Sequence, residues 1–396
     1  MIPRSTVVCL GLAQLISWGT SYYLIGGFGE AIAADLGLSR GLAYGGFSLA
    51  LLVMGLSSPL IGGLIDRHGG RMVMNAGALL SATGCVLLAL SHGVVLYFTA
   101  WICLGLAMRL TLYDAAFAAL ARLGGIAARR AMSQITLPGG LASTVFWPLG
   151  HVIAEHAGWR GAVLAYAGFA LLTIPLHLSL PSGRHEAQAT SAAPPPRPLA
   201  RTGRQRALAG ALYAAIVMGT NVLNAAMSAH MIAILAGLGV AAATAVWVAT
   251  LRGIGQSSAR LLEVLFGGRL HPLALNLLAC ATLPFAFVAG LFSGEAGAAA
   301  LAFAFVYGAA NGIVTITRGT LPLMLFDPRS YGALVGRLLV PGFIVSAAAP
   351  LAYAAVIGRF GEAGALVLSF ITAALVAVAA AWLAVAFRPQ RADRDR

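Results

Sequence analysis

The chain has 396 residues, of which 60% are hydrophobic and only 9% are charged, whereas a soluble domain carries about a quarter charged residues. Over this length, such a deficit indicates a protein that crosses a membrane many times. All 25 basic residues are Arg, which excludes a P-loop ATP site and a Schiff-base cofactor, because both need a lysine.

Apolar segments of about 20 residues recur along the whole chain. In chain order they cover residues 7–29, 42–65, 72–92, 95–120, 132–155, 160–180, 207–232, 240–266, 271–292, 297–321, 333–357 and 363–387. The first segment is longer than the apolar region of a signal peptide and no convincing cleavage site follows it, so we expect it to be retained. The pattern predicts an all-α integral membrane protein with twelve transmembrane helices.

A polar stretch divides these segments into six and six. Residues 181–206 are rich in Pro and Arg and are not expected to form a packed element. The predicted organisation is an N-terminal six-helix bundle (1–181), a cytoplasmic linker (182–206), a C-terminal six-helix bundle (207–387) and a cytoplasmic tail (388–396).

Arginine is distributed unevenly between the two sides of the predicted membrane. With the N-terminus in the cytoplasm, eighteen Arg lie in cytoplasmic loops and tails, and only Arg40, Arg160 and Arg359 lie on the other side. This bias follows the positive-inside rule and predicts that both termini are cytoplasmic. It also explains the net charge of +13 without a nucleic-acid partner. The Gly- and Ala-rich composition with Arg in place of Lys favours a high-GC bacterium, and hence the bacterial cytoplasmic (inner) membrane.

The loop between the second and third predicted helices reads GGLIDRHGGR, residues 62–71. With the six-plus-six architecture, this loop resembles the major facilitator superfamily, whose signature G-x-L-a-D-R-x-G-R-R it matches at six positions. The matching positions are Gly62, Leu64, Asp66, Arg67, Gly69 and Arg71. The resemblance implies two pseudo-symmetric six-helix bundles, and a loop that latches the two halves together on the cytoplasmic side in the outward-open state.

The residues of this loop suit a gate. The glycines are expected to permit a tight turn and close helix approach. Asp66, at the end of a helix, is expected to pair with Arg and with a neighbouring helix N-terminus. A basic loop that only fixes the topology is the alternative interpretation.

Three further stretches resemble the monocarboxylate-transporter-like branch of the superfamily, including its bacterial members. They are LGLSRGLAYGGFSLALL (36–52), ARRAMSQITLPGG (128–140) and GWRGAVL (158–164). The acidic-Gly-Gly signature of animal members is missing from the first predicted helix, which reads SWGTSYY. The drug-antiporter signature of the fifth helix is kept only at Pro148 and Gly150. This partial match makes an exporter less favoured but leaves it as an alternative.

The eighth predicted helix carries a polar stripe. At 100° per residue, Arg252, Gln256 and Glu263 share one face, and Arg260 lies nearby. The resemblance implies a substrate-binding Arg in this helix, and Arg252 is the matching position. A guanidinium offers a planar fork to an anion, although a structural ion pair is the alternative. Near the cytoplasmic end, Arg260 and Glu263 are expected to pair with each other or to join the gate.

The fourth predicted helix places Arg109 and Tyr113 on one face, as candidates for substrate contact. Asp114 lies about 140° away from Arg109 around a regular helix, so the two are not expected to pair within it. Asp114 is the only acidic residue deep in the first half and is predicted to carry a coupling proton. A salt bridge to an Arg is the alternative.

Other polar side chains are predicted to line a central cavity. Trp18 and Tyr22 share a face of the first helix, Asn221 and Asn224 share a face of the seventh, and the tenth carries Asn311. Arg318 lies toward the cytoplasmic end of the tenth helix and is assigned to the gate, with lining of the cavity as the alternative.

The charges within the predicted helices favour an anionic solute. Four Arg face two acids, Asp114 and Glu263, and a cavity of net positive charge attracts anions. We therefore expect a monomeric secondary transporter of a small anionic solute, working by alternating access with proton coupling. A proton-coupled exporter of drugs, metabolites or toxic oxyanions is the alternative, followed by a non-transporting sensor. No enzyme, cofactor or metal site is expected, because the four Cys lie singly in apolar runs and no catalytic set is found.

Overall fold

The computed structural model describes residues 2–124, 128–181, 198–266, 270–326 and 331–388. Over these residues the protein consists of helices and short connections, without a strand. The helices of the first half are α1 (Arg4–Ser17), the π-helix η1 (Trp18–Tyr22), α2 (Leu24–Asp35), α3 (Arg40–Leu56), α4 (Ser58–His68), α5 (Gly70–Ala89), α6 (Val94–Thr111), α7 (Tyr113–Gly124), α8 (Arg129–Gly140) and α9 (Ala142–Leu178). The helices of the second half are α10 (Gly203–Gly237), α11 (Ala242–Phe266), α12 (Pro272–Leu291), α13 (Gly297–Leu325) and α14 (Tyr331–Ala386).

Several of the membrane-length spans are not single regular helices. The first consists of α1, η1 and α2, the second of α3 and α4, and the fourth of α6 and α7. The fifth span consists of α8 and the part of α9 before Gly158, and the rest of α9 is the sixth. In the same way α14 contains two spans, joined at Gly361; φ is +67° at Gly158 and +69° at Gly361. In the described parts of the chain, eight helical segments are long and apolar enough to cross a membrane. With these breaks and joins the described helices form twelve spans, in the order that the sequence predicts.

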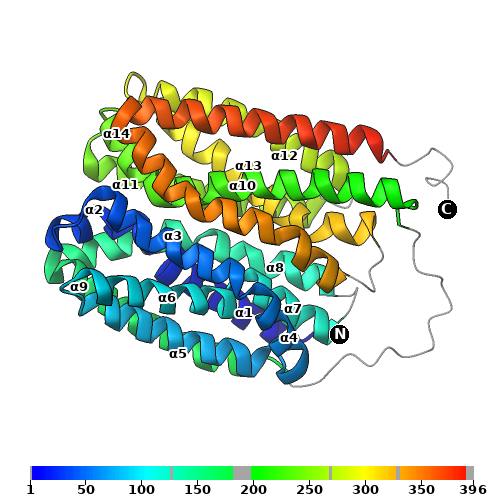
Figure 1. The fold of residues 1–396 in the computed structure, drawn as a ribbon, viewed down its shortest axis with the longest axis horizontal. Helices are drawn as coiled ribbons and strands as arrows, with labels where there is room; N and C mark the ends of the chain where they lie inside the picture. The colour runs from blue at the N-terminus through cyan, green and yellow to red at the C-terminus, as the bar shows by residue number, and fades with distance from the viewer. Residues whose placement is uncertain (1, 125–127, 182–197, 267–269, 327–330, 389–396) are drawn as a thin grey trace.

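The two halves of the chain form two helical bundles that lie side by side. In Figure 1 the first half, blue to cyan, occupies the lower part and the second half, green to red, the upper part. Both joining glycines stand in matching sequences, GWRGA at 158–162 and GEAGA at 361–365. A positive φ favours glycine because a Cβ would crowd the backbone there. The same hairpin therefore recurs at the corresponding place in each half.

Each bundle has a core of aromatic and small apolar side chains. Trp101 and Tyr166 are buried in the first bundle, and Phe287 and Phe303 are buried in the second. Small residues let the helices approach closely, as at Gly105, where an added Cβ would lie 2.5 Å from the carbonyl oxygen of Ala50. Each bundle therefore has its own packed core, and the interface lies between the two bundles.

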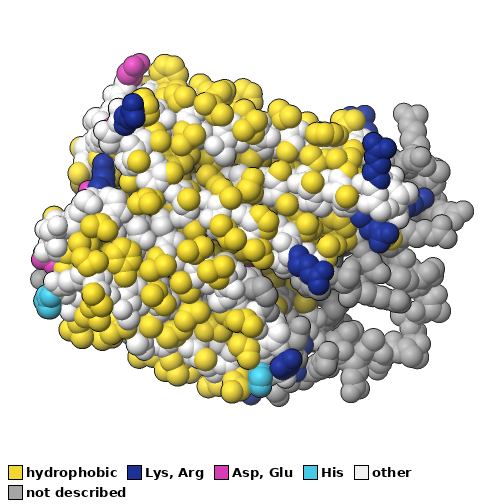
Figure 2. Space-filling view, viewed as in Figure 1, with side chains coloured by type: hydrophobic (Ala, Val, Ile, Leu, Met, Phe, Trp, Pro, Cys, Tyr) yellow, Lys and Arg dark blue, Asp and Glu magenta, His cyan; other side chains and the backbone are white. Residues whose placement is uncertain are grey.

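The outer surface suits a chain surrounded by lipid. Figure 2 shows apolar side chains across the middle of the molecule, and Arg side chains gathered at its ends. Large apolar side chains such as Phe285 and Leu375 are exposed on this surface. The first residues of α1 and the last residues of α14 lie at the same end of the molecule (Figure 1), which we call the terminal face. The other end is the opposite face.

The bundles touch each other closely near the opposite face. A Cβ at Gly26 of α2 would lie 2.2 Å from the carbonyl oxygen of Ser228 in α10. The rings of Tyr44 in α3 and His230 in α10 lie 4.2 Å apart between centroids. His230 is fully buried, and its Nε2 lies 2.8 Å from the carbonyl oxygen of Pro350. This contact closes the interface on that side.

Candidate functional site

A polar cavity of about 100 Å³ lies at the interface of the two bundles. Its walls come from η1, α3, α6, α7, α8, α10, α11, α13 and the first part of α14. Eight of the nine side chains predicted to contact a solute line it, namely Trp18, Tyr22, Arg109, Tyr113, Asn221, Asn224, Gln256 and Asn311. Asp114 and Arg318 line it as well. Residues far apart in the sequence are thus brought to one place, as expected for a site between two repeats.

The first span reaches the cavity through a break in its helix. At η1 the N–H of Tyr23 donates to the carbonyl oxygen of Trp18, five residues earlier, at 3.1 Å. The wider turn presents Trp18, Tyr22 and Tyr23 to the cavity together. Such π-segments are frequent at functional sites. Trp18 and Tyr22 were predicted from the sequence, whereas Tyr23 was not, because its only signal is that it follows Tyr22 in SWGTSYY.

The fourth span is also broken, and this corrects one expectation. The chain is extended at Leu112, with φ −75° and ψ −176°, between the end of α6 and the start of α7. Because the helix is not continuous, the expectation that Arg109 and Asp114 do not pair is wrong, and Arg109 Nη1 lies 3.6 Å from Asp114 Oδ2. Asp114 stands in the first turn of α7, where the helix dipole favours a carboxylate.

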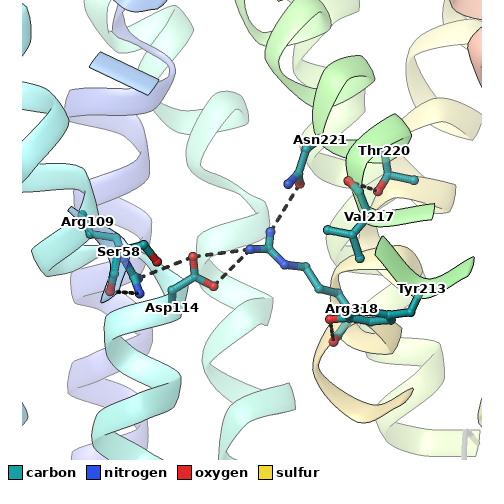
Figure 3. Close-up of polar contacts among 8 residues, drawn as sticks. All are labelled: Ser58, Arg109, Asp114, Tyr213, Val217, Thr220, Asn221 and Arg318. Atoms are coloured by element: carbon teal, nitrogen blue, oxygen red, sulfur yellow. Dashed lines mark hydrogen bonds and ion pairs between the residues drawn. The ribbon is translucent and has the colours of Figure 1, made fainter. Parts of the chain in front are cut away.

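Asp114 is also paired across the bundle interface. Arg318 of α13 reaches over with its Nη2, which lies 3.2 Å from Asp114 Oδ1 and 3.4 Å from Oδ2. The Nη1 of Arg318 donates to Asn221 Oδ1 at 3.4 Å. Figure 3 shows Asp114 between Arg109 and Arg318. One carboxylate therefore serves two guanidinium groups from opposite bundles, and the group of three carries a net charge of +1.

Arg252 lies next to the cavity but does not line it. The side chain is fully buried, and its Nη2 donates to Asn224 Oδ1 at 2.7 Å and to Ser228 Oγ at 3.0 Å. Its guanidinium stands 5.2 Å from the ring centroids of both Tyr23 and Tyr307. No carboxylate of the described residues forms an ion pair with it. Tyr307 was not predicted from the sequence, although it precedes Asn311 by one helical turn.

Arg260 crosses the interface instead of pairing with Glu263. Its Nη1 donates to Tyr113 Oη at 3.1 Å and to the carbonyl oxygen of Thr136, and its Nε donates to the carbonyl oxygen of Gly312 at 3.3 Å. No ion pair with Glu263 is found in the described part of the chain. Buried acceptors from several helices hold the guanidinium of Arg260 better than the half-buried carboxylate of Glu263 three residues away. Of the two expectations, pairing within α11 is therefore wrong.

The loop at 62–71 is partly as expected. Gly69, with φ +81°, forms the turn between α4 and α5, and a Cβ at Gly70 would lie 2.2 Å from that of Ala119. Gly62, in contrast, faces open space, so the close approach expected there is wrong. Arg67 is exposed, and the side chain of Asp66 lies outside the described residues.

Two arginines tie this loop to its own bundle. The Nε of Arg71 donates to the carbonyl oxygen of Leu180 at 2.7 Å, and the Nη1 of Arg122 donates to that of Ile65 at 2.8 Å. Ile65 lies in the last turn of α4 and Leu180 follows the end of α9, where the negative end of the helix dipole favours a cation. The loop is thereby fixed at the terminal face, next to the start of the predicted linker. Residues 182–197 of that linker and 389–396 of the predicted tail lie outside the described residues.

The cavity wall has hydrogen-bond donors left over. Among the described lining residues, the buried side-chain nitrogens with neither a hydrogen bond nor an ion pair are Trp18 Nε1, Arg109 Nε and Asn221 Nδ2. All of them are N–H donors, and a buried donor without a partner is unfavourable by about 1–3 kcal/mol. The wall therefore complements a molecule that brings acceptor oxygens. No group of His, Cys, Asp or Glu in the described residues could hold a metal ion.

Twelve membrane-length spans in two bundles, with a polar cavity between them, define a multi-pass membrane protein of the secondary-transporter type. The family model of the Major Facilitator Superfamily matches residues 10–350. The chain belongs to this superfamily, which confirms the predicted fold class and the resemblance on which it rested. Membership indicates a protein embedded in a membrane and points to transport instead of catalysis.

Curated relatives match only parts of the chain. Monocarboxylate transporter 3 of Mus musculus is 36% identical over 132 residues, which are 31% of this chain and 25% of that protein. Monocarboxylate transporter 6 of Homo sapiens is 31% identical over 156 residues, 38% of this chain and 30% of that protein. An uncharacterized 38 kDa protein of Thermoproteus tenax is 29% identical over 59% of each chain. The matches thus span a quarter to three fifths of these relatives, and they confirm the likeness to the monocarboxylate-transporter branch.

Solved structures share the fold over nearly the whole chain. A mutant of the nucleoside transporter NupG superposes with a TM-score of 0.69 at 14% identity, covering 97% of this chain and 99% of that one. The human organic anion transporter MFSD10 superposes with a TM-score of 0.66 at 19% identity, covering 96% and 100%. At such low identity these likenesses establish the fold alone.

Proposed function

We propose that the protein is a secondary transporter that binds a small anionic solute in the central cavity and carries it by alternating access, coupled to protons. The observation that carries this proposal is the excess of donors and positive charge in the cavity wall. Arg109 and Arg318 share the single carboxylate of Asp114, and the leftover partners are all N–H groups. An acceptor-rich anion supplies what this wall lacks.

The positive charge of Arg252, just outside the cavity, also favours an anionic solute. Arg252 is buried without a carboxylate partner among the described residues, so its field adds to that of the cavity arginines. The names of the curated relatives that are monocarboxylate transporters agree with an anionic cargo.

Proton coupling is assigned to Asp114. An oxyanion that binds Arg318 competes with the Asp114 carboxylate for the same N–H groups, because the two are chemically alike. A proton taken up by Asp114 releases the guanidinium and keeps the charge of the loaded cavity close to that of the empty one. The solute and the proton would then enter together and leave together.

Closure on the two sides is assigned to different contacts. Tyr44, His230 and the Gly26–Ser228 approach close the opposite face. The predicted gate belongs to the terminal side and consists of the residues Gly62, Asp66, Arg67, Gly69, Arg71, Arg260, Glu263 and Arg318. We place the terminal face in the cytoplasm of a bacterium, because of the Arg excess, with the protein monomeric in the inner membrane.

An exporter of drugs or metabolites is the second candidate, and one observation favours it. The cavity has an aromatic wall, in which the rings of Trp18 and Tyr113 lie 5.0 Å apart, and those of Tyr113 and Phe117 stack at 5.6 Å. Such a wall suits a larger apolar body.

A thermal-stability screen of the purified protein separates these candidates. The panel contains acetate, pyruvate, benzoate, phosphate, a nucleoside and the lipophilic cation tetraphenylphosphonium. A ligand of the folded state raises the melting temperature by mass action. We expect a rise with one of the four anions that is lost in Arg318→Gln and kept in Arg359→Gln, since Arg359 is exposed. A rise with the nucleoside or the cation alone would contradict the proposal.

A further inference from the structure

Arg252 presents a buried charge whose use the cavity alone does not explain. It is fully buried, it has no carboxylate partner among the described residues, and its Nε and Nη1 have no hydrogen-bond partner. A charge held in this way is costly, because it has lost its hydration without gaining an ion pair. The contacts of its remaining nitrogen, Nη2, therefore identify what it does.

The first of these contacts fixes the amide of Asn224. The Oδ1 of Asn224 accepts from Arg252 Nη2 at 2.7 Å and from Asn311 Nδ2 at 3.1 Å. Both lone pairs of this oxygen are thereby used. Turning the amide over would place its NH₂ group against two donors, so Asn224 has one orientation, with Nδ2 pointing away from Arg252.

The fixed amide in turn sets the hydroxyl of Tyr22. The Nδ2 of Asn224 donates to Tyr22 Oη at 3.1 Å, across the interface from α10 to η1. The Tyr22 oxygen acts as the acceptor in this bond, so its own hydrogen is available to another group. In the part of the chain that the structure describes, no protein acceptor takes that hydrogen, and Tyr22 lines the cavity.

We propose that Arg252 and Asn224 are positioning residues, which hold the Tyr22 hydroxyl with its hydrogen directed to the cavity, where it donates to an acceptor oxygen of the bound anion. This inference rests on the proposed function and deepens it. Arg252 acts on the solute through Asn224 and Tyr22 without touching it. A positive charge at the start of a series of hydrogen bonds strengthens each of the later donors.

The step from Asn224 to Tyr22 is tested by a double-mutant cycle on uptake into proteoliposomes. The probe is the panel anion, among acetate, pyruvate, benzoate and phosphate, that the unaltered protein carries. We expect Tyr22→Phe and Asn224→Leu each to raise KM by about 10-fold with little change in kcat, the loss of one hydrogen bond to a charged group. The double variant should show the same increase of about 10-fold, because both changes remove one contact.

A second pair gives the matched control. Asn221 stands one turn before Asn224 on α10 and contacts Arg318, on a different wall of the cavity. The increases in KM caused by Asn221→Leu and by Tyr22→Phe should therefore multiply in the double variant, to about 100-fold if each single change raises KM by about 10-fold. If Asn224→Leu with Tyr22→Phe multiplies in the same way, Asn224 contacts the anion itself and the inference is wrong.

The step from Arg252 to Asn224 is tested without any solute. Asn224→Asp keeps the shape of the side chain but gives Arg252 a carboxylate at the position of the present amide. We expect the melting temperature to rise, while KM also rises, because the Tyr22 hydroxyl then donates to the new carboxylate. An unchanged or lower melting temperature of Asn224→Asp would overturn the assigned role of Arg252. This measurement needs no cargo. It therefore tests the role of Arg252 even if no anion of the panel is carried and the proposed function is wrong.

Discussion

Two clusters join the bundles across the same cavity, and they are built in opposite ways. Around Asp114, two arginines share one carboxylate, and the side chains of Asp114 and Arg318 are 29% and 23% exposed. Around Arg252, a single guanidinium is fully buried and is held by an amide, a hydroxyl and two aromatic rings. An ion pair that faces a cavity can exchange its partner for a solute at little cost. A buried cation cannot, so it is suited to holding its neighbours in place.

The largest expected effect comes from a change in the cluster around Asp114. Arg318→Gln removes the cation that links Asp114 to the second bundle, together with a charge-assisted contact to the solute. We expect the uptake rate of the carried anion at low concentration to fall by about 100-fold in proteoliposomes, the upper range for one such contact. Arg359→Gln, on the exposed opposite side, serves as the control. A rate for Arg318→Gln within threefold of the unaltered protein would remove Arg318 from the binding site.

Asp114→Asn should separate binding from coupling. The asparagine cannot take up the proton, so accumulation driven by a pH gradient should disappear, while exchange of labelled for unlabelled anion continues. The anion should also bind more tightly, because no carboxylate competes for Arg109 and Arg318. Gradient-driven uptake and exchange are measured side by side in the same proteoliposomes. Accumulation that persists in Asp114→Asn would assign the coupling proton to another group.

Arg109 should matter less than Arg318 within the same cluster. Its Nη1 lies 3.6 Å from Asp114, and its Nη2 also donates to the carbonyl oxygen of Ser58 at 3.4 Å, so its contact is looser. We expect Arg109→Gln to lower the uptake rate by about 10-fold. Equal losses in Arg109→Gln and Arg318→Gln would show that the two guanidinium groups contribute equally, contrary to the geometry.

Much of this arrangement could be predicted from the sequence because membranes constrain it so strongly. The length and spacing of the apolar segments gave twelve spans, and polar residues within them marked most of the cavity wall. Predictions from the 100° spacing of a regular helix were wrong where the helices break. Arg109 and Asp114 meet because the chain is extended at Leu112, and Tyr23 joins Trp18 because η1 is a wider turn. Neither break has a proline or another strong local signal at that position.

The roles of the arginines could not be predicted from their depth alone. Arg252 and Arg318 both lie within spans, yet one is enclosed by Tyr23 and Tyr307 and the other reaches Asp114. The difference depends on side chains from other helices, in one case from the other bundle, and phase along one helix says nothing about them. For the same reason Arg260 turned to Tyr113 and not to its neighbour Glu263.

The smallest expected effect on KM comes from a change in the cluster around Arg252, where it separates the two acceptors of that guanidinium. Ser228 gives Arg252 a second acceptor, at 3.0 Å, but its own hydroxyl donates to the carbonyl oxygen of Asn224 and not to Tyr22. Ser228→Ala should therefore lower the free energy of unfolding by about 1–3 kcal/mol, the cost of one lost acceptor for a buried cation. KM should change less than twofold, since the Asn224–Tyr22 bond is left in place. Denaturation and uptake of the same preparation measure both quantities. A KM for Ser228→Ala that rises as much as that for Asn224→Leu would mean that the whole environment of Arg252, and not the orientation of one amide, determines how the solute is held.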